Sequence, residues 1–343
     1  MKNEVKIGNK KIGGNNPTYI IAEIGSNHNK DKKIAKKMID KAAEAGVDAV
    51  KFQTFQADKL YSKKTPKFSK DKMKPYDLIK SIELPRGWQK ELAQYATKKK
   101  LHFLSSPFDF EAVDELHKIG VPAFKVASFE ITDLELLKRI AKKKKPVILS
   151  TGMASIEEIE EAIDAIKSQG NDDVILLHCN SMYPSPIDIV NLKAINTMQS
   201  AFQIPIGFSD HTIGIHIPVA AVVNGARVIE KHITLDRKMK GPDHNFAIEP
   251  DELKQMVQNI RDVEKAMGTG VKEISKKEKE MYEKGRRSII AAQDISKDTK
   301  ITRNMLIVKR PGYGIKPKFI DIVVGKKAKK DISEDQWITW EDI

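Results

Sequence analysis

From about residue 17 onward, apolar residues follow two alternating patterns along the chain. Short runs rich in apolar and β-branched residues, such as Tyr19–Glu23, predict buried strands. Longer segments follow, in which apolar residues recur every three or four positions, as in Ile34–Gly46, and these predict amphipathic helices. A strand and a helix in regular alternation are typical of βα units that build a parallel sheet.

Eight runs of the strand type occur before residue 233: 19–23, 49–53, 102–106, 123–127, 146–150, 174–179, 205–209 and 227–232. Eight βα units in this length predict an α/β fold, a closed (β/α)8 TIM barrel over residues 17–268. Helix signals agree with this prediction. Gly46 suits a C-terminal cap, Ser155 begins a capping-box-like pattern, and acidic residues open a last helix from Glu249 to about Met267.

The segments on either side differ from this pattern. Residues 1–16 predict a hairpin that caps one mouth of the barrel. Residues 269–284 are rich in charge and predict a linker. Residues 285–343 predict a small second domain with short strand-like pieces at 288–292, 301–302, 305–309, 321–325 and 336–340.

The chain of 343 residues carries 60 Lys and Arg against 47 Asp and Glu, a net charge of +13. Its lysines gather in short clusters such as 98–100 and 142–145 without interleaved aromatic residues, which favours solvated surface over a nucleic-acid interface. A small phosphorylated ligand fits this charge better. No apolar run approaches the roughly 20 residues of a membrane span. The N-terminus lacks a secretory signal, so we expect a cytoplasmic protein with no membrane partner.

In a TIM barrel the reactive groups lie at the carboxyl ends of the strands. Any single polar residue there could be a helix cap or a surface side chain, but polar residues at every end together predict an active site. In chain order the ends offer Glu23 and Asn27; Lys51 and Gln53; Ser105 and Ser106; Lys125 and Ser128; Ser150 and Thr151; Asn180, Ser181 and Tyr183; Ser209, Asp210 and His211; Glu230 and His232.

Lys51 and Lys125, among hydroxyl groups, suit a ligand that carries both a phosphate and a carboxylate. As structural residues they would be charges buried without a partner, which is costly. His211 and His232 fall on neighbouring strands, where imidazoles can converge on one divalent cation. The alternative is a pair of core histidines bonded to the backbone. Glu23 is either an acid–base group or the salt-bridge partner of a lysine.

Several motifs occur in order along the chain and carry a family resemblance. They are AEIGSNHN at 22–29, VKFQT at 50–54, FKVAS at 124–128, LSTGM at 149–153, YPSP at 183–186, GFSDHT at 207–212 and EKH at 230–232. Over residues 17–343 the chain resembles the bacterial and archaeal N-acetylneuraminate (sialic acid) synthases and their legionaminate and pseudaminate relatives. Residues 285–343 resemble the antifreeze-like (SAF) domain of that family.

The resemblance implies an enzyme that condenses phosphoenolpyruvate with N-acetylmannosamine, or a related N-acetylated amino sugar, to give a nonulosonic acid and phosphate. It implies that His211 and His232 hold Mn2+, with Mg2+ or Co2+ as alternatives, and that the protein is a domain-swapped homodimer. Arg310 would reach the sugar from the partner subunit. The phosphoenolpyruvate contacts would be Lys51, Lys125, Ser128, Ser150 and Ser209, with Ser105 and Ser106 as further candidates and Ser181 favoured over Asn180.

On the sugar side, the resemblance implies contacts from Gln53, Tyr183 and Asp243. The family has an asparagine in the loop after the second strand, and residues 58–73 contain none. The segment Gly241-Pro-Asp-His244 is more similar to neuraminate and legionaminate synthases than to pseudaminate synthases. Legionaminate synthesis from 2,4-diacetamido-2,4,6-trideoxymannose is therefore the first alternative.

Two alternatives come from other classes. A Schiff-base aldolase would use one desolvated lysine as its nucleophile, without a metal or a phosphate site. A non-catalytic carbohydrate-binding protein would keep the fold and lose the reactive groups. The presence of Glu23, both lysines and both histidines favours an enzyme over that last reading.

Overall fold

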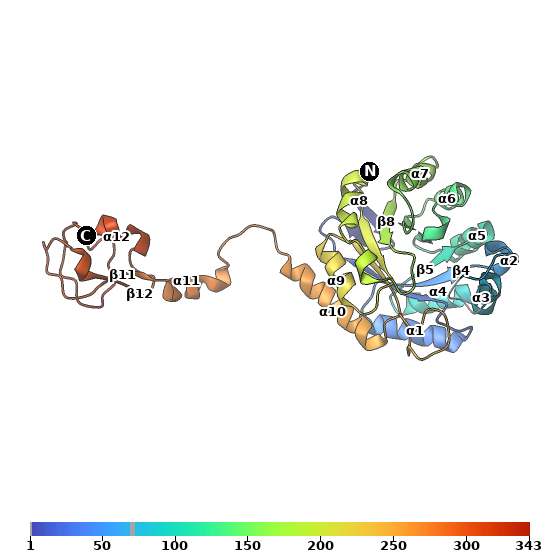
Figure 1. Cartoon of the computed structure of the whole chain (residues 1–343), viewed down its shortest axis with the longest axis horizontal. Coiled ribbons are helices and arrows are strands. Elements are labelled where there is room, and N and C mark those ends of the chain that lie inside the picture. Colours follow the sequence, from blue (N-terminus) through green and yellow to red (C-terminus); the bar gives the residue numbers. More distant parts are fainter. Residues whose placement is uncertain (1, 69–72) are drawn as a thin grey trace. The chain divides into compact units, whose positions relative to one another are not determined.

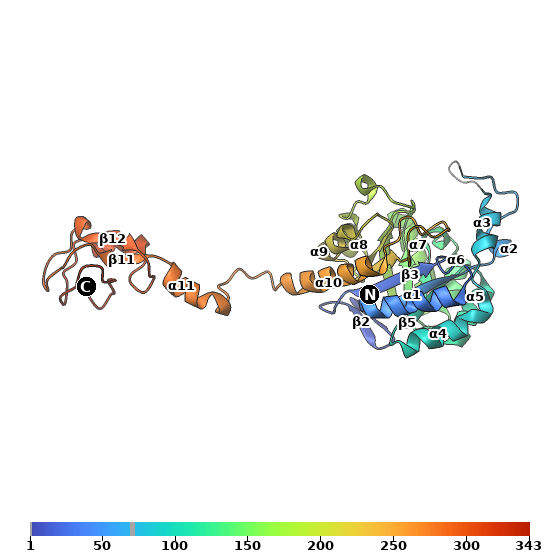
Figure 2. The ribbon, with the colours of Figure 1, turned by 90° about the horizontal axis from the view of Figure 1, so that it is seen from below.

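The computed structural model describes residues 2–68 and 73–343. Within the described parts of the chain, clustering of contacts separates two compact units, one that ends at Gly268 and one that begins at Thr269. Each unit has a hydrophobic core of its own, so the units are described one after the other. Figure 1 shows the helices of the first unit ranged around its strands, and Figure 2 gives the view at right angles.

Within the described residues, eight strands of the first unit form one sheet in the order β5-β4-β3-β10-β9-β8-β7-β6. In chain order the first of these strands is β3 and the last is β10. These two strands pair in parallel, so the beginning and the end of the βα repeat lie side by side. The predicted TIM barrel is thereby confirmed as a near-closed parallel barrel. Its strands are β3 (Tyr19–Gly25), β4 (Ala49–Thr54), β5 (His102–Pro107), β6 (Phe124–Val126), β7 (Val147–Ser150), β8 (Val174–Cys179), β9 (Ile206–Asp210) and β10 (Val228–His232).

The helices of the first unit, apart from α2 and α3, bury apolar residues against the outside of the strands. They are α1 (Lys32–Ala45), α2 (Ala57–Leu60), α3 (Pro75–Ile82), α4 (Gln89–Lys98), α5 (Phe110–Ile119), α6 (Leu134–Ala141), α7 (Ile156–Lys167), α8 (Ala194–Phe202), α9 (His216–Val223) and α10 (Pro250–Ala266). Short 3-10 turns η1 (Arg86–Trp88), η2 (Ser128–Glu130) and η3 (Ile187–Ile189) occur in the loops. Figures 1 and 2 both show α1 and α10 side by side.

The predicted helix boundaries follow local chemistry. Gly46 ends α1 with a left-handed φ of 81°, a conformation that glycine adopts without steric cost. The Ser155 hydroxyl accepts from the amide of Glu158 and the Glu158 carboxylate accepts from the amide of Ser155, which is the predicted capping box of α7. Such signals depend on neighbouring residues alone, so the sequence predicts them well.

A hairpin fills the end of the barrel that carries the amino ends of the strands. It consists of β1 (Glu4–Ile7) and β2 (Lys10–Gly13), paired antiparallel. Val5, Ile7 and Ile12 are buried in one cluster with inward-facing strand residues. The strand residues of that cluster are Tyr19, Ile21, Ala49, Leu104, Ala123, Ile148, Ile175, Leu177 and Val228.

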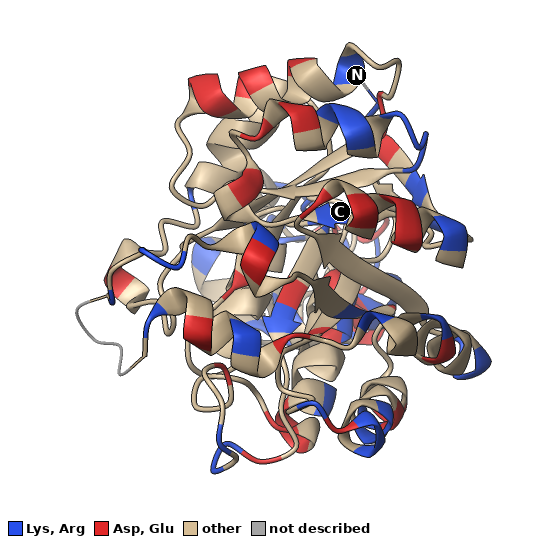
Figure 3. Ribbon diagram, turned by 90° about the vertical axis from the view of Figure 1, so that its right-hand side faces the viewer, with Lys and Arg blue, Asp and Glu red and all other residues tan. Residues whose placement is uncertain are grey.

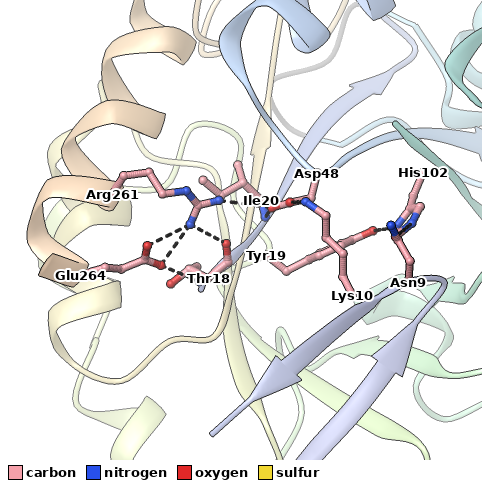
Figure 4. Close-up of polar contacts among 9 residues, drawn as sticks. All are labelled: Asn9, Lys10, Thr18, Tyr19, Ile20, Asp48, His102, Arg261 and Glu264. Carbon is pink, nitrogen blue, oxygen red and sulfur yellow. Dashed lines mark hydrogen bonds and ion pairs between the residues drawn. The ribbon is translucent and has the colours of Figure 1, made fainter. Parts of the chain in front are cut away.

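Polar contacts fasten this end of the barrel (Figure 4). The buried carboxylate of Asp48 pairs with Lys10 of the hairpin, and it lies 3.4 Å from a guanidinium nitrogen of Arg261 on α10. His102, at the start of β5, bonds through Nε2 to Asn9 Oδ1 in the hairpin turn at 3.0 Å. These contacts join the hairpin and α10 to the residues at the beginnings of β4 and β5.

The second unit is small and has little regular structure. It contains η4 (Lys276–Glu278), α11 (Lys279–Gly285), β11 (Ser288–Ala291), η5 (Arg303–Met305), β12 (Leu306–Lys309), η6 (Pro317–Phe319) and α12 (Ile320–Val323). Strands β11 and β12 pair antiparallel over a core that includes Ile289, Ile295 and Ile338. Part of the predicted linker is helical, since η4 and all but the last residue of α11 lie within it.

The prediction of strand structure at 321–325 is wrong, because the chain forms helix α12 at Ile320–Val323 directly after the turn η6. Val323 is buried there and Ile322 is 52% exposed. An apolar run of this length fits either period, so the sequence could not separate them. The runs at 301–302 and 336–340 form no regular strand: an isolated bridge joins Lys300, next to the first run, to Lys327, and another joins Trp337 of the second run to Ile290.

The charges of the first unit are mixed in sign over its helices (Figure 3). Many are paired, as in the ion pair of Lys32 with Glu91 at 2.6 Å. In the segments that the structure describes, no helix is both long and apolar enough to cross a lipid bilayer.

Candidate active site

Buried charges converge at the carboxyl ends of β3, β4, β6 and β10. Lys51 Nζ lies 2.9 Å from Glu23 Oε2 and 3.8 Å from Glu230 Oε2. Lys125 Nζ lies 3.8 Å from Glu230 Oε1. The four side chains are at most 5% exposed. The salt bridge of Glu23 to a lysine, one of the two interpretations of that carboxylate, is present, and Glu230 is a second counter-ion, so the lysines are not buried without partners.

The two lysines differ in their electrostatic surroundings. Burial lowers the pKa of Lys51, but the nearby carboxylates of Glu23 and Glu230 outweigh burial, and the pKa is raised. Burial lowers the pKa of Lys125 below its ordinary value despite Glu230. Burial also raises the pKa of Glu23, whereas at Glu230 the two lysines outweigh burial and the pKa is lowered. Glu230 is thus the shared counter-ion, and Glu23 is the better proton acceptor.

Hydroxyl groups surround the lysines. Lys125 donates to Ser150 Oγ at 2.7 Å, and Lys51 Nζ is 3.4 Å from Ser106 Oγ. Ser209 donates to Glu230 Oε1 at 2.9 Å. The structure thus brings Ser106, Ser150 and Ser209 to the charged cluster.

Two further serine hydroxyls, those of Ser128 and Ser181, lie close to the backbone of Gly152. The Gly152 amide donates to Ser128 Oγ at 3.0 Å, and a Cβ at this position would stand 2.4 Å from Ser181 Oγ. Ser181 Oγ is buried and has no hydrogen-bond partner among the described residues. The side-chain amide of Asn180 instead donates to the carbonyl of Ile189 at 3.0 Å. Asn180 Oδ1 is also buried without a partner among the described residues, but it can only accept, so of these two alternatives Ser181 has the donor free for an anion.

Ser105 is not brought to this cluster. Its hydroxyl pairs with Thr54 Oγ1 at 2.7 Å, and Thr54 in turn donates to Gln89 of α4. Successive residues of a strand point to opposite faces, so Ser105 faces the helices when Ser106 faces the barrel interior.

His211 and His232 lie together at the ends of β9 and β10, with ring centroids 5.4 Å apart. His211 Nδ1 is 2.8 Å from the carbonyl oxygen of Asn180. His232 Nδ1 is buried and lacks a hydrogen-bond partner in the described part of the chain. Burial and the neighbouring His211 hold the pKa of His232 well below its ordinary value, so its ring is neutral.

A buried neutral imidazole with an unpartnered nitrogen fits a cation ligand better than a core histidine, which would be hydrogen-bonded. Asp243 Oδ2 is 3.7 Å from His232 Nδ1. No group of three or more His, Cys, Asp or Glu side chains in residues 2–68 and 73–343 is arranged to hold a metal ion. The two imidazoles fit a divalent cation that takes its other ligands from water or substrate.

Two of the residues predicted on the sugar side, Tyr183 and Asp243, border this pair, and the third, Gln53, contacts Glu23. Gln53 Nε2 donates to Glu23 Oε1 at 2.7 Å. The ring of Tyr183 lies 4.3 Å from that of His211, and its side chain is 47% exposed. Ser26 donates to Asp243 Oδ2 at 3.3 Å, and burial raises the pKa of Asp243 to about 6.

Arg310 belongs to the second unit, where it lines an open cavity of about 490 Å³ together with Tyr282, Met281 and Arg286. The guanidinium of Arg286 stacks 4.4 Å from the ring centre of Tyr282. In the loop without the family's asparagine, residues 69–72 lie outside the described residues.

Sequence reasoning lists Glu230 among the polar strand ends but does not predict it as the counter-ion of the lysines, although Glu230 and His232, two residues apart on one strand, must share a face. It misses Glu130. Glu130 lies in η2, where burial raises its pKa to about 7, and its Oε2 has no hydrogen-bond partner within the described segments. Its position two residues after Ser128, at the end of β6, was the available signal.

Comparison with known proteins agrees with the geometry. The NeuB family matches residues 38–272, and the SAF domain matches residues 286–343. The chain is 45% identical to N,N'-diacetyllegionaminic acid synthase of Campylobacter jejuni over 94% of this chain and 98% of that protein. It is 38% identical to pseudaminic acid synthase of the same species, over 96% of each chain.

Among solved structures, N-acetylneuraminic acid synthetase from Leptospira borgpetersenii, in complex with citrate, superposes with a TM-score of 0.74 at 40% identity. The match covers 81% of this chain and 94% of that one. The predictions of a synthase-type enzyme and of a C-terminal SAF domain are thereby confirmed. The chain belongs to the NeuB family of synthases.

Proposed function

We propose that this protein condenses phosphoenolpyruvate with an N-acetylated amino sugar to give a nonulosonic acid and inorganic phosphate. N-acetylmannosamine, which would give N-acetylneuraminate, is the first acceptor. The observation that carries the proposal is the buried cluster of Lys51, Lys125 and Glu230 beside two histidines, one with an unpartnered nitrogen. An anion acceptor and a cation site next to each other suit this pair of substrates.

Phosphoenolpyruvate is a compact ligand with a phosphate and a carboxylate. Lys51 and Lys125 would bind these groups, because an arriving anion competes with Glu230 for both ammonium groups. Ser150, Ser209 and the free hydroxyl of Ser181 add donors at short range. Glycine at position 152 lets the hydroxyls of Ser128 and Ser181 approach the backbone, because a Cβ there would stand 2.9 Å and 2.4 Å from their Oγ atoms.

In the reaction, C3 of phosphoenolpyruvate forms a bond to the aldehyde carbon of the sugar, and the aldehyde oxygen takes up a proton. Water then adds to the electron-poor C2, and Glu23 accepts a proton from it, which suits a carboxylate whose pKa burial has raised. The C2–O bond to phosphate then breaks as the C2 hydroxyl becomes the keto group and its proton passes to the departing phosphate, which Lys51 and Lys125 stabilise. Gln53 holds Glu23 in place through its 2.7 Å hydrogen bond.

His211 and His232 would hold the divalent cation, most simply Mn2+, with Mg2+ or Co2+ as alternatives. When bound, such a cation polarises the aldehyde oxygen as a Lewis acid. Asp243 and Tyr183 lie next to this pair and would orient the hydroxyl groups of the sugar.

A second acceptor has support of its own. The 45% identity to a legionaminic acid synthase exceeds the 38% identity to a pseudaminic acid synthase. 2,4-Diacetamido-2,4,6-trideoxymannose is therefore the second candidate, with legionaminate as product. The third candidate acceptor is the altrose-configured isomer that pseudaminate synthesis requires.

Phosphate release with phosphoenolpyruvate and each of the three sugars tests the proposal. We expect turnover with one manno-configured acceptor, loss of turnover with a chelator, and its return with Mn2+. His211→Ala should abolish turnover, whereas His117→Ala, on the exposed face of α5, should not. Full activity in metal-free protein, or no phosphate release with any acceptor, would contradict it. Reduction with borohydride in the presence of substrate should trap no adduct, since a trapped lysine would indicate a Schiff-base aldolase.

A further inference from the structure

An ion pair lies on the outer face of the sheet, directly behind the two histidines. Asp210, the last residue of β9, and Lys231 of β10 are register partners. Lys231 Nζ is 2.5 Å from Asp210 Oδ2, and both side chains are 0% exposed. Their strand neighbours Ser209 and Glu230 meet inside the barrel, so the alternation of the strands turns Asp210 and Lys231 toward the helices.

The pair also fixes the backbone before and after His211. Asp210 itself precedes this histidine, and its Oδ1 accepts from the amide of Thr212 at 2.9 Å. Lys231 donates to the carbonyl oxygen of Thr212. Since Lys231 immediately precedes His232, one buried link ties the backbone at His211 to the backbone at His232.

Stability alone does not account for such a pair. Removing two charges from water costs several kcal/mol per ion, and apolar replacements of similar volume are often neutral or stabilising. The proposed mechanism does not use either side chain. What the pair does provide is a defined register between β9 and β10 at the point where the two imidazole rings are 5.4 Å apart.

We propose that the Asp210–Lys231 ion pair is a positioning device that holds His211 and His232 in the arrangement that binds a divalent cation. It contacts neither the cation nor the substrates. This inference rests on the proposed cation site. Asp210 and Lys231 are the residues that hold the two ligands of that site in place.

The test uses the full chain with three variants, Asp210→Asn, Lys231→Met and the double variant Asp210→Leu/Lys231→Met. The affinity for Mn2+ is measured from the electron paramagnetic resonance signal of the free ion, and stability from thermal unfolding without metal. Loss of a residue that orients a metal ligand typically weakens affinity roughly ten- to hundredfold. We expect this loss in the double variant while its unfolding temperature stays at or above that of the wild type. The visible spectrum of bound Co2+ should change as well.

A matched control lies at the opposite end of the barrel, in the network of Figure 4. The double variant Asp48→Asn/Arg261→Met removes another largely buried pair but leaves Lys10 and Glu264 without their ion-pair partners, so it should lower stability and leave Mn2+ affinity unchanged. The inference is overturned if Asp210→Leu/Lys231→Met binds Mn2+ like the wild type while His211→Ala does not bind it. If His211→Ala also binds like the wild type, the cation site itself is wrong and the inference falls with it.

Discussion

At the scale of single residues, the decisive feature is a balance of buried charge. Lys51 and Lys125 share Glu230, and within the described residues Glu23 forms its one ion pair with Lys51. Four charges of mixed sign keep this cluster close to neutral, which limits the cost of burial. An anionic substrate then needs only to displace Glu230 from the lysines.

Replacement of Lys51 or Lys125 by Met should weaken the binding of phosphoenolpyruvate far more than the binding of the sugar. Loss of one charged hydrogen-bond donor corresponds to roughly a ten- to hundredfold rise in the KM for phosphoenolpyruvate. Steady-state kinetics with each substrate varied in turn measures this. Lys138→Met, on the surface of α6, is the control. Equal losses for the two substrates would count against the anion site.

Asp243 predicts a pH dependence of stability. Burial raises the pKa of its carboxyl from 3.8 to about 6, so between these values the folded chain binds a proton that the unfolded chain has released. The stabilisation from this proton is complete below the unfolded value and disappears as pH rises through about 6. Asp243→Asn should therefore gain about 2 to 3 kcal/mol relative to the wild type between pH 4 and pH 7. Urea unfolding of metal-free protein measures it, and a constant difference across this range would refute the shift.

At the scale of elements, the amino-terminal hairpin replaces solvent at the closed end of the barrel. Ile7 and Ile12 are 0% exposed there although they lie on a two-stranded hairpin that could not be stable alone. The barrel thus stabilises the hairpin, and the hairpin completes the barrel core.

Ile7→Ala should lower the free energy of unfolding by about 2 to 5 kcal/mol, because it leaves a cavity in a packed interior. The kinetic constants of the folded variant should stay unchanged, since the reactive groups lie at the other ends of the strands. Urea unfolding and steady-state rates at a temperature where the variant is folded check both statements. Lys6→Ala, exposed on the same strand, should change neither, and a loss of turnover in folded Ile7→Ala would show that the hairpin supports the site.

At the scale of the whole molecule, the question is how the second unit takes part in the site. We propose that Arg310 completes the site of the partner subunit in a domain-swapped homodimer. The support is the separate compact unit that contains Arg310 and the family membership of the chain.

Mixed dimers test this assignment. Glu23→Ala damages the barrel part of a site and Arg310→Ala the second part, so each homodimer should be nearly inactive. After unfolding and random reassembly about half of the dimers are mixed, and one site in each carries neither change, so about a quarter of wild-type activity should return. An inactive mixture in which mixed dimers are demonstrated would mean that Arg310 serves its own barrel.

Local pattern was enough to predict the barrel strands, the Gly46 cap and the Ser155 capping box, because each depends on residues close together in the chain. The apolar run at 321–325 was the exception, since it was too short to show its period. The polar strand ends were also visible in the sequence. Their membership of one site followed from the parallel order that a βα repeat imposes.

The partners across the barrel were not visible in the same way. A side-chain period of two says that Ser105 and Ser106 face opposite ways, but not which of them faces inward. Glu230 neutralises Lys51 because β10 closes against β3, which brings together residues 179 positions apart. Asp210 and Lys231 meet for the same reason, in the register of β9 with β10. Contacts across a closed sheet depend on its register and closure, and only the assembled fold sets these.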